Sequence, residues 1–265
     1  MRLPTPEELT SDDERFLYSH DVLEYHASDP HSFIRLGYLR RLWVMLEMVE
    51  RLGKGLRVLD VGCAQGNLAL LLAEAGHDVT AGDLRPDFLR YARRKYERGK
   101  LTLVELSAEE LPYRECFDLV VLGELLEHAA RPGKLLESAA GAVRPSGRVL
   151  VTTPNGEFFL NRLPTWRQAK PADELAARQF QPDGDGHLFL LTGDELLELV
   201  TGAGLTPETI RYFNSPFATG AAKFRHVGRF LPRPLLGALE RTTSRLPGVR
   251  RRACAAMALM ARRPE

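Results

Sequence analysis

The chain has 265 residues, of which 44% are hydrophobic and 27% are charged, and its formal net charge is +1. These values are ordinary for a folded globular protein, and the length suits one α/β domain with additions or a domain with a small cap. No segment approaches the ~18 uninterrupted apolar residues of a spanning helix, and the polar, acidic start is not the pattern of a signal peptide. Cys63, Cys116 and Cys254 lack metal-ligand spacing, so we expect reduced cysteines and a cytoplasmic protein.

The charge is spread unevenly along the chain. Residues 220–265 hold eleven Lys or Arg against two acids, a local charge of about +9, and leave about −8 on the remainder. Two interpretations stay open: a solvated basic face, or a surface that contacts an anionic membrane or an acidic partner. We expect no nucleic-acid partner, because aromatic residues do not alternate with the basic ones.

Residues 1–55 are predicted to form a helical cap. Apolar residues recur here at three- and four-residue spacing: Phe33, Leu36, Leu39, Leu42, Trp43, Leu46 and Val49. This spacing predicts an amphipathic helix that packs on a sheet and ends near Gly53. The earlier part carries Tyr18, His20, Tyr25 and His26. We expect it to fold over the ligand cleft, with a plain N-terminal brace as the alternative.

The next segment has the pattern of a nucleotide-binding βαβ unit. Residues 57–69 read as an apolar strand, a glycine turn and a helix start, and Asp83 ends a second strand about twenty positions on. A dinucleotide site needs G-x-G-x-x-G, but Ala64 and Asn67 occupy its second and third glycine positions. The acid at the start of the turn, Asp60, would repel a pyrophosphate and favour a ligand with positive charge.

Strands and helices then alternate, which predicts a parallel sheet covered by helices on both faces. Strands are expected at 57–61, 78–83, 101–106, 117–122, 147–153 and 205–213, and helices at 67–75, 85–98, 131–143 and 192–203. The apolar run at 253–261 is compatible with a helix by its pattern alone.

Two insertions depart from a minimal domain, at 155–187 and 214–252. We therefore divide the chain into the cap at 1–55 and a nucleotide-binding domain at 56–265. The first insertion carries four large aromatic residues: Phe158, Phe159, Trp166 and Phe180. Because it leaves the carboxyl edge of the sheet, where ligands bind in such folds, we expect it to be the acceptor lid; the alternative is a surface loop.

The glycine turn resembles motif I, D-x-G-x-G-x-G, of the class I S-adenosylmethionine-dependent methyltransferases. Asp60, Gly62 and Gly66 match, and Ala64 departs by one methyl group. The resemblance continues through LSAEELPY at 106–113, FDLVVLGELLEH at 117–128 and RPGKLLESAAGAVRPSGRVLVTTPN at 131–155.

The resemblance implies a doubly wound, mostly parallel seven-stranded sheet with 253–261 as an antiparallel seventh strand. It also implies S-adenosylmethionine as cofactor, with S-adenosylhomocysteine as product, and a role for Asp83 in accepting both ribose hydroxyls. The implied cofactor contacts are Asp60, Gly62, Cys63, Ala64, Gly66, Asp83, Leu84, Ser107, Ala108, Glu109 and Gly123. Ser107 stands where the family has an acid, which affects the contact with the adenine amino group.

The segment after the fourth strand narrows the resemblance to the O-methyltransferases of ubiquinone biosynthesis, which share E-x-x-E-H. Glu124, Glu127 and His128 have this spacing and share one face if they are helical. Some members bind a divalent cation there; otherwise Glu127 and His128 only cap and brace a helix. His128 and His187 are the candidate general bases, because an imidazole titrates near neutral pH.

These features predict methyl transfer to oxygen on a small-molecule acceptor, such as a quinone, phenol, sugar or secondary metabolite. The alternatives are an N- or C-methyltransferase of the same fold, a non-catalytic binding protein, and a membrane-surface S-adenosylmethionine-binding protein that uses residues 220–265.

Overall fold

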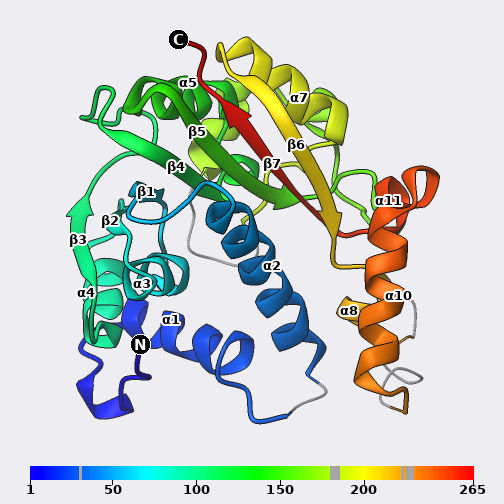
Figure 1. The fold of residues 1–265 in the computed structure, drawn as a ribbon, viewed down its shortest axis with the longest axis horizontal. Helices are drawn as coiled ribbons and strands as arrows, with labels where there is room; N and C mark the ends of the chain where they lie inside the picture. Colours follow the sequence, from blue (N-terminus) through cyan, green and yellow to red (C-terminus); the bar gives the residue numbers. More distant parts are fainter. Residues whose placement is uncertain (30–31, 180–185, 222–223, 225–229) are drawn as a thin grey trace.

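A seven-stranded sheet with the order β3-β2-β1-β4-β5-β7-β6 forms the centre of the structure (Figure 1). The computed structural model describes residues 1–29, 32–179, 186–221, 224 and 230–265. The strands are β1 (Arg57–Val61), β2 (Asp78–Asp83), β3 (Lys100–Glu105), β4 (Phe117–Gly123), β5 (Val143–Pro154), β6 (Thr206–Phe213) and β7 (Ala256–Arg262). β1 to β5 pair in parallel, whereas β7 runs antiparallel to both β5 and β6. The predicted fold class is confirmed.

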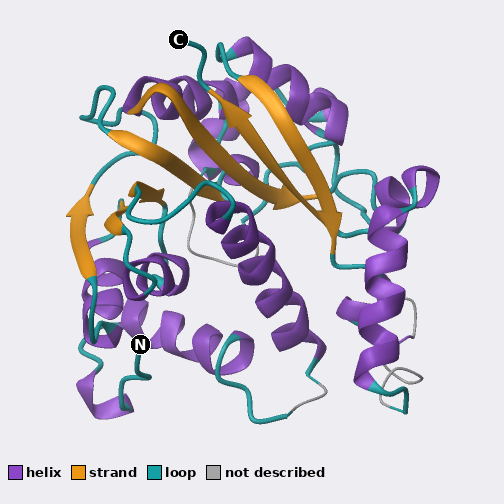
Figure 2. Ribbon diagram, viewed as in Figure 1, coloured by secondary structure: helices purple, strands orange, loops and turns teal. Residues whose placement is uncertain are grey.

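Helices cover both faces of this sheet (Figure 2). They are α1 (Asp12–Glu24), α2 (Phe33–Glu50), α3 (Asn67–Glu74), α4 (Pro86–Lys95), α5 (Pro132–Ala142), α6 (Ala172–Leu175), α7 (Gly193–Gly202), α8 (Pro216–Thr219), α10 (Arg233–Arg245) and α11 (Pro247–Ala253). Alternate residues of β4 enter two separate cores: Val120 and Leu122 pack with α5 and α7, and Leu119 and Val121 pack with α2 and α3. Burial on both faces explains why the strands read as continuous apolar runs.

The seventh strand shows why the local pattern was ambiguous. Every residue from Ala256 to Ala261 is buried, so the segment has no polar face that would reveal a period of two. The family resemblance, which implied an antiparallel strand, is confirmed by the pairing of Leu150 with Met260 and of Ile210 with Leu259.

Helix α2 packs on the sheet, but through a face that differs from the expected one. Its buried residues are Gly37, Tyr38, Leu42, Val44, Met45, Met48 and Val49. Trp43, expected on the apolar face, is 61% exposed. Two neighbouring stripes of the helix are apolar, one with Trp43 and one with Val44 and Met48. The spacing alone therefore does not indicate which stripe faces the core.

The first insertion packs against the C-terminal region. The Phe159 amide donates to the Arg252 carbonyl at 3.0 Å, which ties the insertion to α11, and Arg167 pairs with Glu198 of α7. Phe180 lies outside the described residues. Within the described part, the insertion reaches the candidate site through its last residue, His187.

Part of the positive charge of residues 220–265 is neutralised by acids elsewhere in the chain. Arg251 binds Glu157 at 2.9 Å and Asp194 at 2.7 Å, and Arg263 binds Glu115 at 2.7 Å. These pairs fix the end of the chain to the sheet and its helices. Among the described residues, no helix has the length and apolar character needed to cross a membrane.

We expect Gly99→Ala to destabilise the fold more than Gly53→Ala. Both glycines have positive φ, +101° and +114°, which costs an L-residue about 1–2 kcal/mol. A Cβ on Gly99 would also lie 2.3 Å from the Ala73 carbonyl oxygen of α3, whereas nothing lies within 4 Å of one on Gly53. Urea denaturation should show that Gly99→Ala lowers the free energy of unfolding by about 2 kcal/mol more than Gly53→Ala does. Equal decreases in the two variants would show that α3 moves to accommodate the methyl group without loss of stability.

Candidate active site

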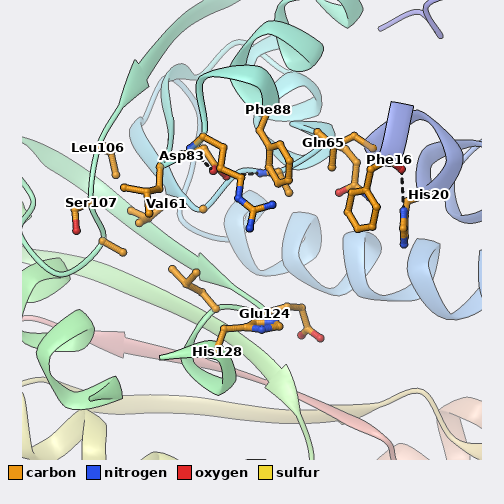
Figure 3. Close-up of a pocket in the computed structure, with 17 residues that line it drawn as sticks. Phe16, His20, Val61, Gln65, Asp83, Phe88, Leu106, Ser107, Glu124 and His128 are labelled. Atoms are coloured by element: carbon orange, nitrogen blue, oxygen red, sulfur yellow. Dashed lines mark hydrogen bonds between the residues drawn. The ribbon is translucent and has the colours of Figure 1, made fainter. Parts of the chain in front are cut away.

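A pocket of about 280 Å³ opens at the carboxyl ends of β1, β2 and β4 (Figure 3). Neighbouring strands β1 and β4 are followed by connections that lead to opposite ends of the sheet, and such a switch point is where open α/β sheets bind ligands. The lining residues are Phe16, Leu17, His20, Val61, Gly62, Ala64, Gln65, Asp83, Leu84, Arg85, Phe88, Leu106, Ser107, Ala108, Glu124, Leu125 and His128.

The glycine turn shapes one wall of the pocket. Gly62, Ala64 and Gly66 all have positive φ, at +71°, +44° and +73°. Ala64, which stands where the motif has glycine, adopts the left-handed backbone, and its amide donates to Asp83 Oδ2 at 3.0 Å. A Cβ on Gly66 would lie 2.7 Å from the Ala92 Cβ of α4, so this glycine allows α4 to pack against the turn.

Asp83 ends β2 with its carboxylate at the pocket. It is 8% exposed, and its oxygens accept the amide hydrogens of Ala64 and Arg85, both at 3.0 Å. Burial raises the pKa of this carboxyl, and the amide donors oppose the rise. A carboxylate fixed in this way has the geometry to accept the two hydroxyls of a ribose.

Asp60 lies behind the turn and does not line the pocket. Its side chain is buried, and burial together with the nearby Asp83 raises its pKa to about 7, against a small opposing effect of the Ala69 amide. Burial, followed by the charges of the same two acids, also raises the pKa of the Cys63 thiol well above its usual range. The carboxyl groups of Asp60 and Asp83 and the thiol of Cys63 therefore lie close together at the turn. A cation bound there would relieve the repulsion between the two acids.

The predicted cofactor residues divide into two groups. Those that line the pocket are Gly62, Ala64, Asp83, Leu84, Ser107 and Ala108, and those behind it or beside it are Asp60, Cys63, Gly66, Glu109 and Gly123. Sequence reasoning missed Gln65, Arg85 and Phe88, although the first two are direct neighbours of motif residues. It also missed Phe16 and Leu17 of α1, which belong to no motif.

Three further side chains meet beside the pocket. Ligand atoms of Glu127, His128 and His187 all lie within 4.8 Å of one another, and the two imidazole rings are 4.8 Å apart. Glu127 is fully buried, and Thr153 Oγ1 donates to its Oε2 at 3.0 Å. Its Oε1 has no hydrogen-bond partner among the residues that the structure describes. Burial, and then the nearby Glu124, raise the pKa of Glu127 well above its usual range.

Glu124, Glu127 and His128 do not lie in an α-helix, so the condition under which they would share one face is not met. Residues Leu126–His128 form a short 3-10 turn, and Glu124 precedes it with φ of +51°. The Glu124 carboxylate faces Arg41 of α2 at 3.3 Å. His187 joins the cluster instead, because the Leu188 amide donates to the Glu127 carbonyl at 2.9 Å and holds the end of the insertion there.

The strand order, the acidic glycine turn and Asp83 form the pattern expected of a methyltransferase that binds an adenosyl donor. A family profile described as a methyltransferase domain matches residues 59–151. The ubiquinone biosynthesis O-methyltransferase of Bordetella avium is 33% identical over 191 residues, 70% of this chain and 73% of that protein. The protein of the same name from Xanthomonas euvesicatoria pv. vesicatoria is 33% identical over 193 residues, 70% of this chain and 72% of that protein.

Solved structures show the same fold. An S-adenosylmethionine-dependent methyltransferase from Mesorhizobium loti aligns with a TM-score of 0.57 at 19% identity, over 84% of this chain and 98% of that one. The chain belongs to the class I S-adenosylmethionine-dependent methyltransferases, and S-adenosylmethionine is its cofactor.

We expect Asp83→Ala to lower the affinity for S-adenosylhomocysteine about 10²-fold, because two charge-assisted hydrogen bonds to the ribose are lost. Asp78, at the other end of the same strand, is the matched control. Calorimetry should find Asp78→Ala within about twofold of the wild type. An unchanged affinity in Asp83→Ala would contradict the role given to this carboxylate.

We also expect the stability of Asp60→Asn relative to the wild type, both without ligand, to be greater at alkaline pH than at acid pH. Folding raises the pKa of Asp60 from its ordinary 3.8 to about 7. The wild type therefore loses stability as pH rises from about 4 to about 7, on the order of 2–4 kcal/mol, and the loss is constant above that range. Denaturation at several pH values should show the variant gaining over the wild type within this window; a constant difference would contradict the shift.

Proposed function

We propose that the chain methylates an oxygen atom of a small aromatic acceptor. The observation that carries this proposal is the cluster of Glu127, His128 and His187 beside the cofactor pocket, with His128 also lining that pocket. Methyl transfer is an in-line displacement at an activated carbon, so the protein must mainly position the nucleophile and remove its proton. An imidazole at the pocket wall suits proton removal from a hydroxyl.

In this mechanism His128 accepts the proton of the acceptor hydroxyl. The ring of His187 lies 4.8 Å from the ring of His128. The Nε2 atom of His187 lies 4.0 Å from Glu127 Oε1. Burial raises the pKa of Glu127 and so favours its neutral form. An imidazolium that forms nearby would favour the ionised form instead, and the resulting carboxylate would in turn stabilise the imidazolium. Thr153 fixes the other oxygen of Glu127, so the cluster is held in place before the acceptor binds.

The same three residues fit a divalent cation. They offer one carboxylate and two imidazoles. The buried Glu127 Oε1, which accepts no hydrogen bond from any described residue, is an atom that such an ion would satisfy. Glu127, His128 and His187 would hold it, and a cation there would supply Lewis acidity that lowers the pKa of a bound phenol.

One observation supports an aromatic hydroxyl as the target. The apolar walls that Phe16, Phe88 and Leu125 give the cofactor pocket suit the adenine ring and do not bear on the acceptor. The curated relatives are named O-methyltransferases of ubiquinone biosynthesis. An N-methyltransferase would need no strong base, and retention of activity after loss of both histidines would favour it.

We expect His128→Gln and Glu127→Gln to lower kcat about 10²–10⁴-fold, the usual contribution of general base catalysis. Transfer of labelled methyl groups to a panel of phenols and catechols measures this, and calorimetry checks that S-adenosylhomocysteine still binds. His77→Gln is the control, since His77 precedes β2 at the opposite edge of the sheet and bonds the Leu56 amide. Full activity in both cluster variants would overturn the proposal.

Chelation separates the two forms of the mechanism. Activity that falls after treatment with EDTA and returns with Mg²⁺ or Zn²⁺ would support the cation at the cluster. Activity that survives chelation but shows a pH profile abolished by His128→Gln would support His128 as the direct base.

A further inference from the structure

Helix α1 forms the roof of the cofactor pocket. Phe16, Leu17 and His20 line it from this helix, and Phe16 lies beside Gln65 of the glycine turn (Figure 3). Leu17 is 2% exposed and belongs to a small apolar cluster with Leu9, Phe88 and Tyr91. This cluster is separate from the two cores of the sheet, and α1 packs against both α4 and α2.

A buried ion pair fastens α1 to α4. Lys95 Nζ lies 2.5 Å from Asp21 Oδ2, and both side chains are fully buried. The Tyr91 hydroxyl donates to Asp21 Oδ2 at 3.0 Å, and Asn67 Nδ2 donates to Asp21 Oδ1 at 2.7 Å. Every charged atom of the pair therefore has polar partners, which is the condition for such a pair to be tolerated in an interior.

The same lysine reaches the cofactor turn. Lys95 Nζ donates to the Gln65 carbonyl at 3.1 Å and to Asn67 Oδ1. Gln65 lines the pocket, and its Nε2 donates to Glu24 Oε2 at 2.9 Å, near the end of α1. Two connections thus link α1 to the turn, one through Asp21 and Lys95 and one through Glu24.

We propose that Asp21 and Lys95 are positioning residues that hold α1 over the bound cofactor and fix the Gln65 carbonyl, so that cofactor exchange requires α1 to lift and the ion pair to separate. This goes beyond the proposed acceptor chemistry and rests only on the cofactor. Lifting α1 would return both ions to water, and their hydration offsets much of the lost attraction. The ion pair therefore fixes α1 in its position over the pocket, and the free energy needed to lift α1 stays moderate.

The test compares the dissociation rate of S-adenosylhomocysteine from the wild type and from the double variant Asp21→Asn/Lys95→Met. The double variant is used because Lys95→Met alone would leave Asp21 buried without its partner charge, which unfolds proteins. We expect dissociation to become about tenfold faster, with a matching loss of affinity, because such changes fall mainly on the off-rate.

Leu196→Ala is the matched control for general destabilisation. Leu196 is fully buried in α7, away from the pocket, and its truncation leaves a cavity. Its dissociation rate should stay within about twofold of the wild type. Hydrogen exchange of residues 12–24 is the second readout: the product should protect these amides in the wild type and in Leu196→Ala, but much less in the double variant.

Equal dissociation rates in the wild type and the double variant would overturn the proposal, as would the same acceleration in Leu196→Ala. Product-independent exchange of residues 12–24 in the wild type would also overturn it. These outcomes differ from a failure of the proposed acceptor chemistry, because that failure would leave the binding of S-adenosylhomocysteine unchanged.

Discussion

Two carboxyl groups buried near each other are the constraint on which the rest of the site depends. Asp60, in β1, and Asp83, at the end of β2, lie on adjacent strands. Asp83 is satisfied by two backbone amides, whereas Asp60 has a pKa raised to about 7 by burial and by Asp83. A pyrophosphate would add negative charge to this region. A sulfonium and an ammonium would supply compensating charge, so the two acids favour an adenosyl donor over a dinucleotide.

In the proposed mechanism, the order of the strands places the donor and the proton-accepting residue on opposite sides of one gap. The adenosyl side comes from the ends of β1 and β2 and from the loop after β3, where Ser107 and Ala108 line the pocket. The transfer side comes from the turn after β4, where His128 meets His187. The connection after β1 leads toward β2 and the one after β4 leads toward β5, so their loops diverge and leave the space that the reaction needs.

The sequence predicted the sheet, because apolar runs separated by turns are local patterns. The cofactor contacts remain predictions, and six of the eleven residues named for them line the pocket. Glu124, Glu127 and His128 would share one face only in a helix, whereas the chain makes a 3-10 turn there and His187 joins the cluster from about sixty residues away. Nothing local marks the partnership of Asp21 with Lys95 either. Lys95 follows two arginines in α4 and reads as part of a solvated basic stretch, and only the packing of α1 shows that it is buried.

Cys63 has a consequence for the lifetime of the enzyme. S-adenosylmethionine is an alkylating agent, and this sulfur atom belongs to the turn that wraps around it. Sulfur reacts as a thiolate and hardly at all as a thiol, and the two acids beneath the turn, with burial, keep Cys63 protonated. The acids that favour a cationic donor therefore also keep the thiol behind the pocket in its unreactive form, which protects Cys63 from methylation.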